Sequence, residues 1–184
     1  MNTRAIALGL GLGLLPSLST VAVDIPKVEV GLGYQFLHDQ QLETNFPAGW
    51  LASLNGNVND WLGLMAEFSG SYKTVDELGS DVKVKVYTFM GGFRFAKYFD
   101  RGAAYFQLLG GAARLESSGQ VVGASFEAAT TKFAFQPGIG LDGRLTDHLR
   151  VRIGGDYRLI FTDVVKTNEW RAHAGFVITF GGVS

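Results

Sequence analysis

The segment from Phe133 to Phe161, "FAFQPGIGLDGRLTDHLRVRIGGDYRLIF", alternates between apolar residues and polar or small ones. Before the polar "TDH", the apolar residues Phe133, Ile139 and Leu141 all occupy odd-numbered positions and so share one parity. After it, Ile153 belongs to the apolar parity. A period of two is typical of β-strands, because successive side chains point to opposite faces. The segment therefore predicts two strands joined by a tight turn. A soluble barrel would bury the apolar face, whereas a membrane barrel would turn it toward lipid.

The composition limits the class of protein. The 184 residues suffice for one domain, and 47% are hydrophobic while 18% are charged. The 16 basic residues nearly balance the 17 acidic ones, so we expect no nucleic-acid partner. The chain has no cysteine, which excludes a disulfide framework, a thiolate zinc site and a cysteine nucleophile.

The first residues predict a targeting segment. The basic start "MNTR" precedes the apolar run "AIALGLGLGLL", which is too short to cross a bilayer as a helix. The following "PSLSTVA" offers small residues for cleavage after Ala22. We expect a signal peptide over residues 1–22 and a barrel domain over residues 23–184. The alternative is an N-terminal anchor helix that stays attached.

Alternating segments recur along the rest of the chain and predict eight strands. They cover residues 28–37, 50–58, 61–73, 82–95, 104–116 and 169–180, together with the two halves of the opening segment. In segment 82–95 the valines occupy even positions, whereas the aromatic residues occupy odd positions. This shift of the apolar residues from one face to the other indicates a bulge, or a strand whose first part lies outside the apolar zone. Short connections alternate with longer polar ones, as in barrels with tight periplasmic turns and longer outer loops. We expect the turns near Asp60 and Asp147 to be periplasmic.

The glycines decide which face points inward. An eight-stranded barrel has a narrow lumen that small side chains must help to fill. Glycine is frequent on the polar parity, as at Gly31, Gly138 and Gly140, whereas most of the 14 Phe, 6 Tyr and 3 Trp lie on the other. Those rings would overfill the lumen but suit a lipid-facing band. We predict an all-β fold, an eight-stranded antiparallel up-and-down transmembrane β-barrel.

This orientation directs charged side chains into the lumen, where they should pair, because an isolated buried charge is costly. The predicted lumen network consists of Glu67, Arg94, Asp142, Arg144, Arg152, Asp156, Arg158 and Arg171. We expect Glu67 to bond to at least one of Arg94, Arg144 or Arg152 and to close the channel. Glu29 and Arg150 lie near the predicted periplasmic mouth, either in the lumen or in water at the rim.

The sequence resembles the family of eight-stranded outer-membrane β-barrel domains, related to the OmpA, OmpX and OmpW types. The resemblance spans Val28 to Phe180, and its best parts are "NGNVNDWLGLMAEFSGSY" (residues 55–72) and residues 133–158. It implies a location in the outer membrane of a Gram-negative-type bacterium. It also implies contact with outer-membrane lipid and lipopolysaccharide, and with the insertion machinery during biogenesis. We expect a monomer.

The pattern offers no catalytic, cofactor or metal site. His38 and His148 fall on opposite sides of the predicted membrane, and His173 points inward without an evident serine partner. We therefore expect a non-enzymatic barrel with a side-chain-filled lumen, in a structural or surface-loop interaction role. The alternatives are a soluble, lipocalin-like barrel that binds an apolar ligand in its lumen, and a narrow pore.

Overall fold

The computed structural model describes residues 25–39, 44–77, 80–121, 124–161 and 166–183, which are almost entirely β-strand. The strands are β1 (Ile25–Asp39), β2 (Thr44–Phe46), β3 (Ala48–Asn57), β4 (Leu62–Glu77), β5 (Ser80–Phe99), β6 (Gly102–Val121), β7 (Ala124–Arg144), β8 (Leu149–Phe161) and β9 (Lys166–Val183). Among these residues, no helix is long and apolar enough to cross a membrane.

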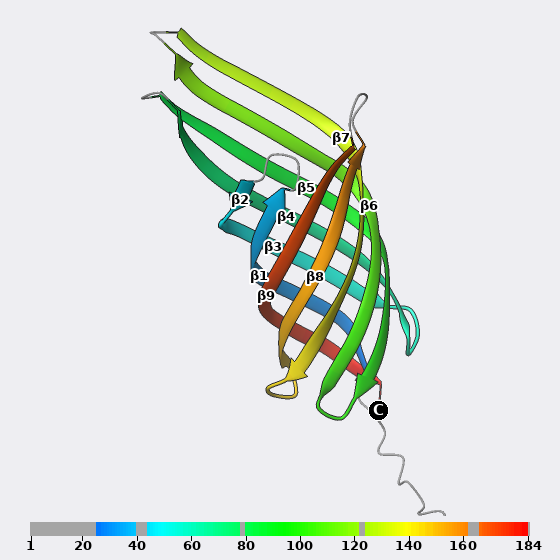
Figure 1. Ribbon diagram of the computed structural model, residues 1–184. Coiled ribbons are helices and arrows are strands. Elements are labelled where there is room, and N and C mark those ends of the chain that lie inside the picture. The colour runs from blue at the N-terminus through cyan, green and yellow to red at the C-terminus, as the bar shows by residue number, and fades with distance from the viewer. Residues whose placement is uncertain (1–24, 40–43, 78–79, 122–123, 162–165, 184) are drawn as a thin grey trace, which may run out of the picture.

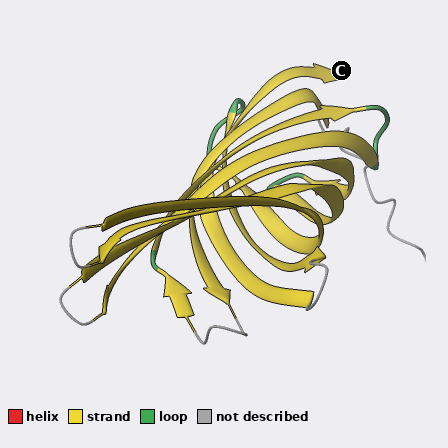
Figure 2. Ribbon diagram, turned by 90° about the horizontal axis from the view of Figure 1, so that it is seen from above, coloured by secondary structure: helices red, strands yellow, loops and turns green. Residues whose placement is uncertain are grey.

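The strands form one closed antiparallel sheet. From β3 to β9 each strand pairs with the next along the chain. β1 pairs with β2 and β3 on one side and with β9 on the other, from Ile25↔Val183 to Asp39↔Glu169, which closes the ring. Figure 2 shows the strands curling around a common axis. The short β2 and the longer β3 both pair with β1 and act as one strand broken at Pro47. The predicted eight-stranded barrel is therefore confirmed.

A β-bulge separates β2 from β3. Leu37 of β1 pairs with Phe46, and Tyr34 pairs with Trp50, so three steps on β1 correspond to four on the other strand. The extra residue lies beside Pro47, which has no N–H to donate to the ladder.

The bulge considered for residues 82–95 is not found. β5 pairs with β4 without interruption from Phe95 to Ser80. The phase change has another cause: Val86 keeps the inward parity and packs against Leu37 and Phe46, while Val84 packs against the same group. Apolar residues therefore occupy the inner side of the strand at this level.

The strands differ in length, which gives the barrel two unlike ends. β5, β6 and β7 have 20, 20 and 21 residues, whereas β8 has 13. About ten tilted residues cross a bilayer. The β4–β5 and β6–β7 hairpins consequently project beyond the ring at one end, and we call them the outer hairpins (Figure 1).

Tight turns occupy the opposite end, which we call the turn side (Figure 1). In the β3–β4 turn, the Asn59 side-chain oxygen accepts hydrogen bonds from the backbone N–H groups of Trp61 and Leu62, at 3.0 and 2.8 Å. In the β7–β8 turn, the Thr146 hydroxyl accepts from the N–H of Leu149 at 3.1 Å. Asn and Thr stabilise such turns because their side chains replace a backbone acceptor.

The two faces of the sheet have opposite chemistry. Phe89, Ile139 and Ile153 on the outside are 62, 64 and 55% exposed, whereas Glu67 and Arg94 inside are 2 and 0% exposed. The apolar face therefore points outward, as predicted. This arrangement is the reverse of a lipocalin-like barrel, which needs its apolar face inside.

Candidate functional site in the barrel lumen

Two clusters of charged side chains fill the lumen, one above the other along the barrel axis. We call them the turn-side cluster, which consists of Glu29, Arg94, Asp142 and Arg152, and the hairpin-side cluster, which consists of Glu67, Asp156, Arg158, Glu169 and Arg171. All nine residues are buried. The nine residues come from six strands, β1, β4, β5, β7, β8 and β9, so the clusters tie together parts of the ring that share no backbone ladder.

The turn-side cluster is a compact quartet. Arg152 Nε donates to Asp142 Oδ1 at 2.7 Å, and Arg152 Nη2 donates to Asp142 Oδ2 at 2.8 Å and to Glu29 Oε2 at 2.9 Å. Arg94 bonds to the same two carboxylates, with 2.7 Å from its Nη2 to Asp142 Oδ2. Two arginines therefore balance two acids.

Two tyrosine rings complete this quartet from inside the barrel. The Tyr98 hydroxyl donates to Glu29 Oε1 at 2.7 Å. The Tyr105 ring lies beside both guanidinium groups, with its centroid 4.3 Å from Cζ of Arg94 and 5.0 Å from Cζ of Arg152. Such contacts stabilise a cation that has lost its water. The sequence interpretation placed the aromatic rings outside the barrel and did not identify these two.

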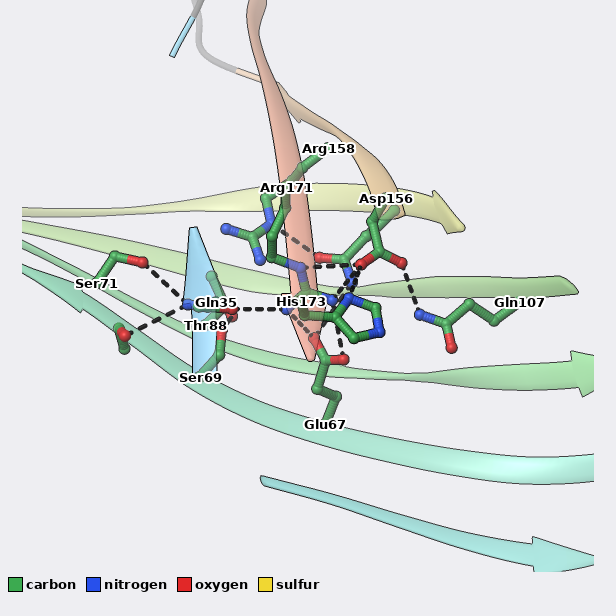
Figure 3. Close-up of polar contacts among 12 residues, drawn as sticks. Gln35, Glu67, Ser69, Ser71, Thr88, Gln107, Asp156, Arg158, Arg171 and His173 are labelled. Carbon is green, nitrogen blue, oxygen red and sulfur yellow. Dashed lines mark hydrogen bonds and ion pairs between the residues drawn. The ribbon is translucent and has the colours of Figure 1, made fainter. Parts of the chain in front are cut away.

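The hairpin-side cluster is organised around Arg171, as Figure 3 shows. Its Nη1 and Nη2 donate to the two oxygens of Glu67 at 2.7 and 3.0 Å. Its Nε and Nη2 donate to Asp156 Oδ2 at 2.9 and 2.6 Å. A guanidinium group satisfies both acids at once because its donors form a planar fork. Arg171 thus joins β4 to β8 through the lumen.

Side-chain amides connect the remaining members of the hairpin-side cluster. Gln107 donates to Asp156 Oδ1 at 2.7 Å, and Gln136 donates to Glu67 Oε1 at 3.2 Å. Arg158 donates from Nε to Gln136 Oε1 at 2.9 Å and from Nη1 to Glu169 Oε2 at 3.1 Å. The sequence interpretation missed these amides, although both lie on the polar parity of their strands.

His173 lies between the two clusters. Its Nε2 is 3.2 Å from the Tyr105 hydroxyl, and its Nδ1 is 3.1 Å from Asp156 Oδ2. Its neighbours are therefore members of the network. This geometry is that of a lumen histidine with polar partners.

Apolar side chains fill the lumen beside and beyond the charges. Met65, Met90, Leu109 and Ile160 form one buried group, and Leu37, Phe46 and Val86 form another near the outer hairpins. The second group lies close to the hairpin end, where Leu37 and Phe46 are paired neighbours. Charged and apolar side chains together occupy the path along the axis.

One residue of the predicted network lies elsewhere. Arg144 is the last residue of β7, is exposed, and donates from Nη2 to Asp147 Oδ1 at 2.5 Å in the turn. This hydrogen bond lowers the pKa of Asp147 below its ordinary value. The other seven residues are buried in the lumen.

The partner of Glu67 also differs from the expectation. Glu67 forms its ion pair with Arg171 and accepts a hydrogen bond from Gln136, whereas Arg94, Arg144 or Arg152 was the expected partner. Arg94 and Arg152 lie nearer the turns, in the other cluster. The sequence left two locations possible for Glu29 and Arg150, the lumen or the rim. They are 1 and 7% exposed and so lie in the lumen. In the described part of the chain, no three His, Cys, Asp or Glu residues are placed to hold a metal ion.

A closed barrel with an apolar exterior, a charged interior and unequal ends defines a bacterial outer-membrane β-barrel protein. The chain belongs to the family of outer membrane protein beta-barrel domains, whose model matches residues 5–177. No curated protein sequence matches the chain.

Three solved structures illustrate the shared fold. Ail, the attachment invasion locus protein of Yersinia pestis, in complex with the heparin analogue sucrose octasulfate, is 21% identical, with a TM-score of 0.58 over 82% of this chain and 96% of that one. Neisserial surface protein A is 13% identical, with a TM-score of 0.60 over 83 and 96%. The N-terminal barrel of Pseudomonas aeruginosa OprF is 12% identical, with a TM-score of 0.51 over 83 and 97%.

Proposed function

We propose that the protein is a non-enzymatic, non-conducting barrel that holds its outer hairpins at the cell surface for contact with other molecules. The filled lumen is the observation that carries this proposal. Arg94, Arg152 and Arg171 are at most 5% exposed, and each bonds to carboxylates from other strands. A conducting pore would need these groups to separate, which is costly in a buried site.

The outer hairpins carry basic side chains on their outward face, directly beyond an aromatic band. Lys85 of β5 is paired with Tyr72, and Arg114 of β6 is paired with Tyr87. The rings of Tyr72 and Tyr87 lie edge to face with centroids 6.0 Å apart. Tyrosine is enriched at the level of lipid headgroups. We propose that this surface contacts the phosphate groups of lipopolysaccharide in the outer leaflet.

Charge and position support this partner. Among the outward-facing side chains that the structure describes on the outer hairpins, Lys83, Lys85 and Arg114 carry three positive charges, and Glu116, which pairs with Arg114 Nε at 2.7 Å, carries one negative charge. Lys83 and Lys85 share the parity of the lipid-facing Phe89, so they project on the lipid side of the hairpin. Basic side chains immediately outside the apolar zone attract anionic lipid headgroups.

The route to the membrane is part of the proposal. We propose that residues 1–22 form a signal peptide cleaved after Ala22 and that residues 23–184 form the mature barrel domain. The outer-membrane insertion machinery would then assemble the protein as a monomer. Each molecule already pairs its first strand with its last, so its ladder needs no second copy.

Conductance tests the closed lumen. Purified protein in a planar bilayer should conduct only in brief flickers, because side chains fill the path. A stable, large conductance from the monomer would overturn this part of the proposal.

A second experiment tests the lipopolysaccharide contact. The variant Lys83→Gln/Lys85→Gln should lose most of the rise in melting temperature that lipopolysaccharide gives to wild-type protein in nanodiscs. Lys97→Gln is the matched control, because Lys97 lies on the same strand and parity but at the turn side. An equal stabilisation of all three proteins would contradict the contact.

A further inference from the structure

Arg150 is a buried cation at the turn-side mouth. It lies on β8, is 7% exposed, and its Nη1 has no hydrogen-bond partner among the described residues. Its guanidinium carbon lies 5.3 Å from the centroid of the Tyr98 ring. A buried charge ordinarily has a partner of opposite charge, because losing hydration is costly.

The neighbouring acids are already neutralised. Glu29 and Asp142 are shared by Arg94 and Arg152. Glu29 also accepts a hydrogen bond from the Tyr98 hydroxyl. Asp147 is bonded to Arg144. In the described ranges no carboxylate forms an ion pair with Arg150. Arg150 is therefore a buried cation without a carboxylate partner in the described part of the chain.

A small polar pocket lies beside this charge. Its volume is about 20 Å³, and its polar lining consists of Arg144, Asp147, His148, Arg150 and Thr179, together with the backbone of Gly181. This volume is on the order of the space that one water molecule needs. It suits a single oxygen atom of a larger group whose remainder stays outside the mouth.

We infer that this pocket binds one oxygen of an anionic group, a carboxylate or a phosphate, presented from the periplasmic side. Arg150 supplies the charge, and Arg144, Asp147 and His148 line the rim, where Asp147 is already paired with Arg144. The anion gives Arg150 a partner of opposite charge. The group comes either from a soluble anion or from the headgroup of a phospholipid in the inner leaflet.

Titration of the purified protein tests the inference. The protein is placed in maltoside micelles, which contain no phosphate, and inorganic phosphate replaces chloride at constant ionic strength. We expect a saturable shift of the backbone amide resonances of Thr179 and Gly181. Arg150→Gln should weaken binding roughly tenfold or more, the effect of losing a charge-assisted hydrogen bond. Arg150→Lys, which keeps the charge, should lose less.

Arg101→Gln is the matched control. Arg101 lies in another turn-side connection, so this variant removes the same charge from the same end without altering the pocket. Its affinity should stay within about twofold of wild type, a difference well below 1 kcal/mol. Unchanged resonances of the outward-facing strand residues verify that each variant is folded.

A second arm identifies the source of the anion. Phosphatidylglycerol is added to the micelles in place of inorganic phosphate. A resonance shift with free phosphate indicates a soluble ligand, and a resonance shift with the lipid alone indicates a lipid headgroup. Either result supports anion binding in the pocket. No saturable shift with either, or an equal shift in Arg150→Gln, overturns the inference.

Discussion

Arg171 and Glu67 form a two-bonded ion pair, at 2.7 and 3.0 Å, although 104 residues separate them in the chain. Their strands, β9 and β4, are three steps apart around the ring, so the pair spans part of the lumen. The same guanidinium bonds to Asp156, which makes Glu67 part of a three-residue group.

Removal of Glu67 should destabilise the barrel strongly. Glu67→Ala leaves Arg171 with one acid fewer in a buried site, a loss on the order of 3 to 5 kcal/mol. The measurement is reversible urea unfolding in lipid vesicles. Glu116→Ala is the control, since it breaks an exposed pair with Arg114 and should cost at most about 1 kcal/mol. Equal, small losses from both changes would show that Glu67 is solvated.

A charge on the lipid face should also destabilise. Ile153 is 55% exposed at the middle of β8. Ile153→Arg should cost about 2 to 4 kcal/mol in the same assay, because the guanidinium enters hydrocarbon. Phe180→Arg, near the turn side, should cost only about 0 to 1 kcal/mol. Similar costs at both positions would mean that the bilayer midplane has been misplaced.

A methyl group should not fit at Gly154. A Cβ there would lie 2.6 Å from His173 Nε2 and 2.8 Å from the Tyr105 hydroxyl. Gly154→Ala should therefore overpack the lumen at a cost of about 1 to 3 kcal/mol. At Gly56 a Cβ would meet nothing within 4 Å, so Gly56→Ala should change stability by no more than about 0.5 kcal/mol. If the two alanine variants unfold at the same urea concentration, the lumen is looser than the structure shows.

The two ends of the barrel should face opposite compartments. Thr130→Cys, on an outer hairpin, should react with a membrane-impermeant maleimide on intact cells. Asp147→Cys, in the β7–β8 turn, should react only after the cells are lysed. Both positions are exposed, so accessibility depends on the compartment alone. Labelling of Asp147→Cys on intact cells would reverse the orientation.

The fold and the direction of each face could be predicted because they rest on local information. The alternation of residues such as Ile139 and Gln136 assigns each side chain to a face without knowledge of any other strand. The frequent glycines among the polar positions then indicated that the polar face lines the narrow lumen. The short strand β2 and the bulge at Pro47 were not predicted, because residues 38–49 fall between the alternating segments and their polar composition indicates a loop.

The pairing inside the lumen could not be predicted in the same way. Which charges meet depends on the stagger between strands around the closed ring, and that stagger is not encoded in any single strand. Glu67 therefore meets Arg171, and Arg94 meets Glu29. Arg144 was assigned to the lumen because its position in the alternation corresponds to the inward face. It is, however, the last residue of β7, and its side chain bonds to Asp147 in the turn.

The ladder between β1 and β9 has a consequence for assembly. Ile25 pairs with Val183 and Asp39 with Glu169, so the first and last strands of the chain are bonding partners. Contacts between such distant positions slow folding, because a very long loop must close before they form. Until β9 arrives, β1 presents an unpaired edge that invites pairing with foreign chains. A growing chain therefore cannot complete its barrel by stages, and the cell must keep it from aggregating until its final strand is available.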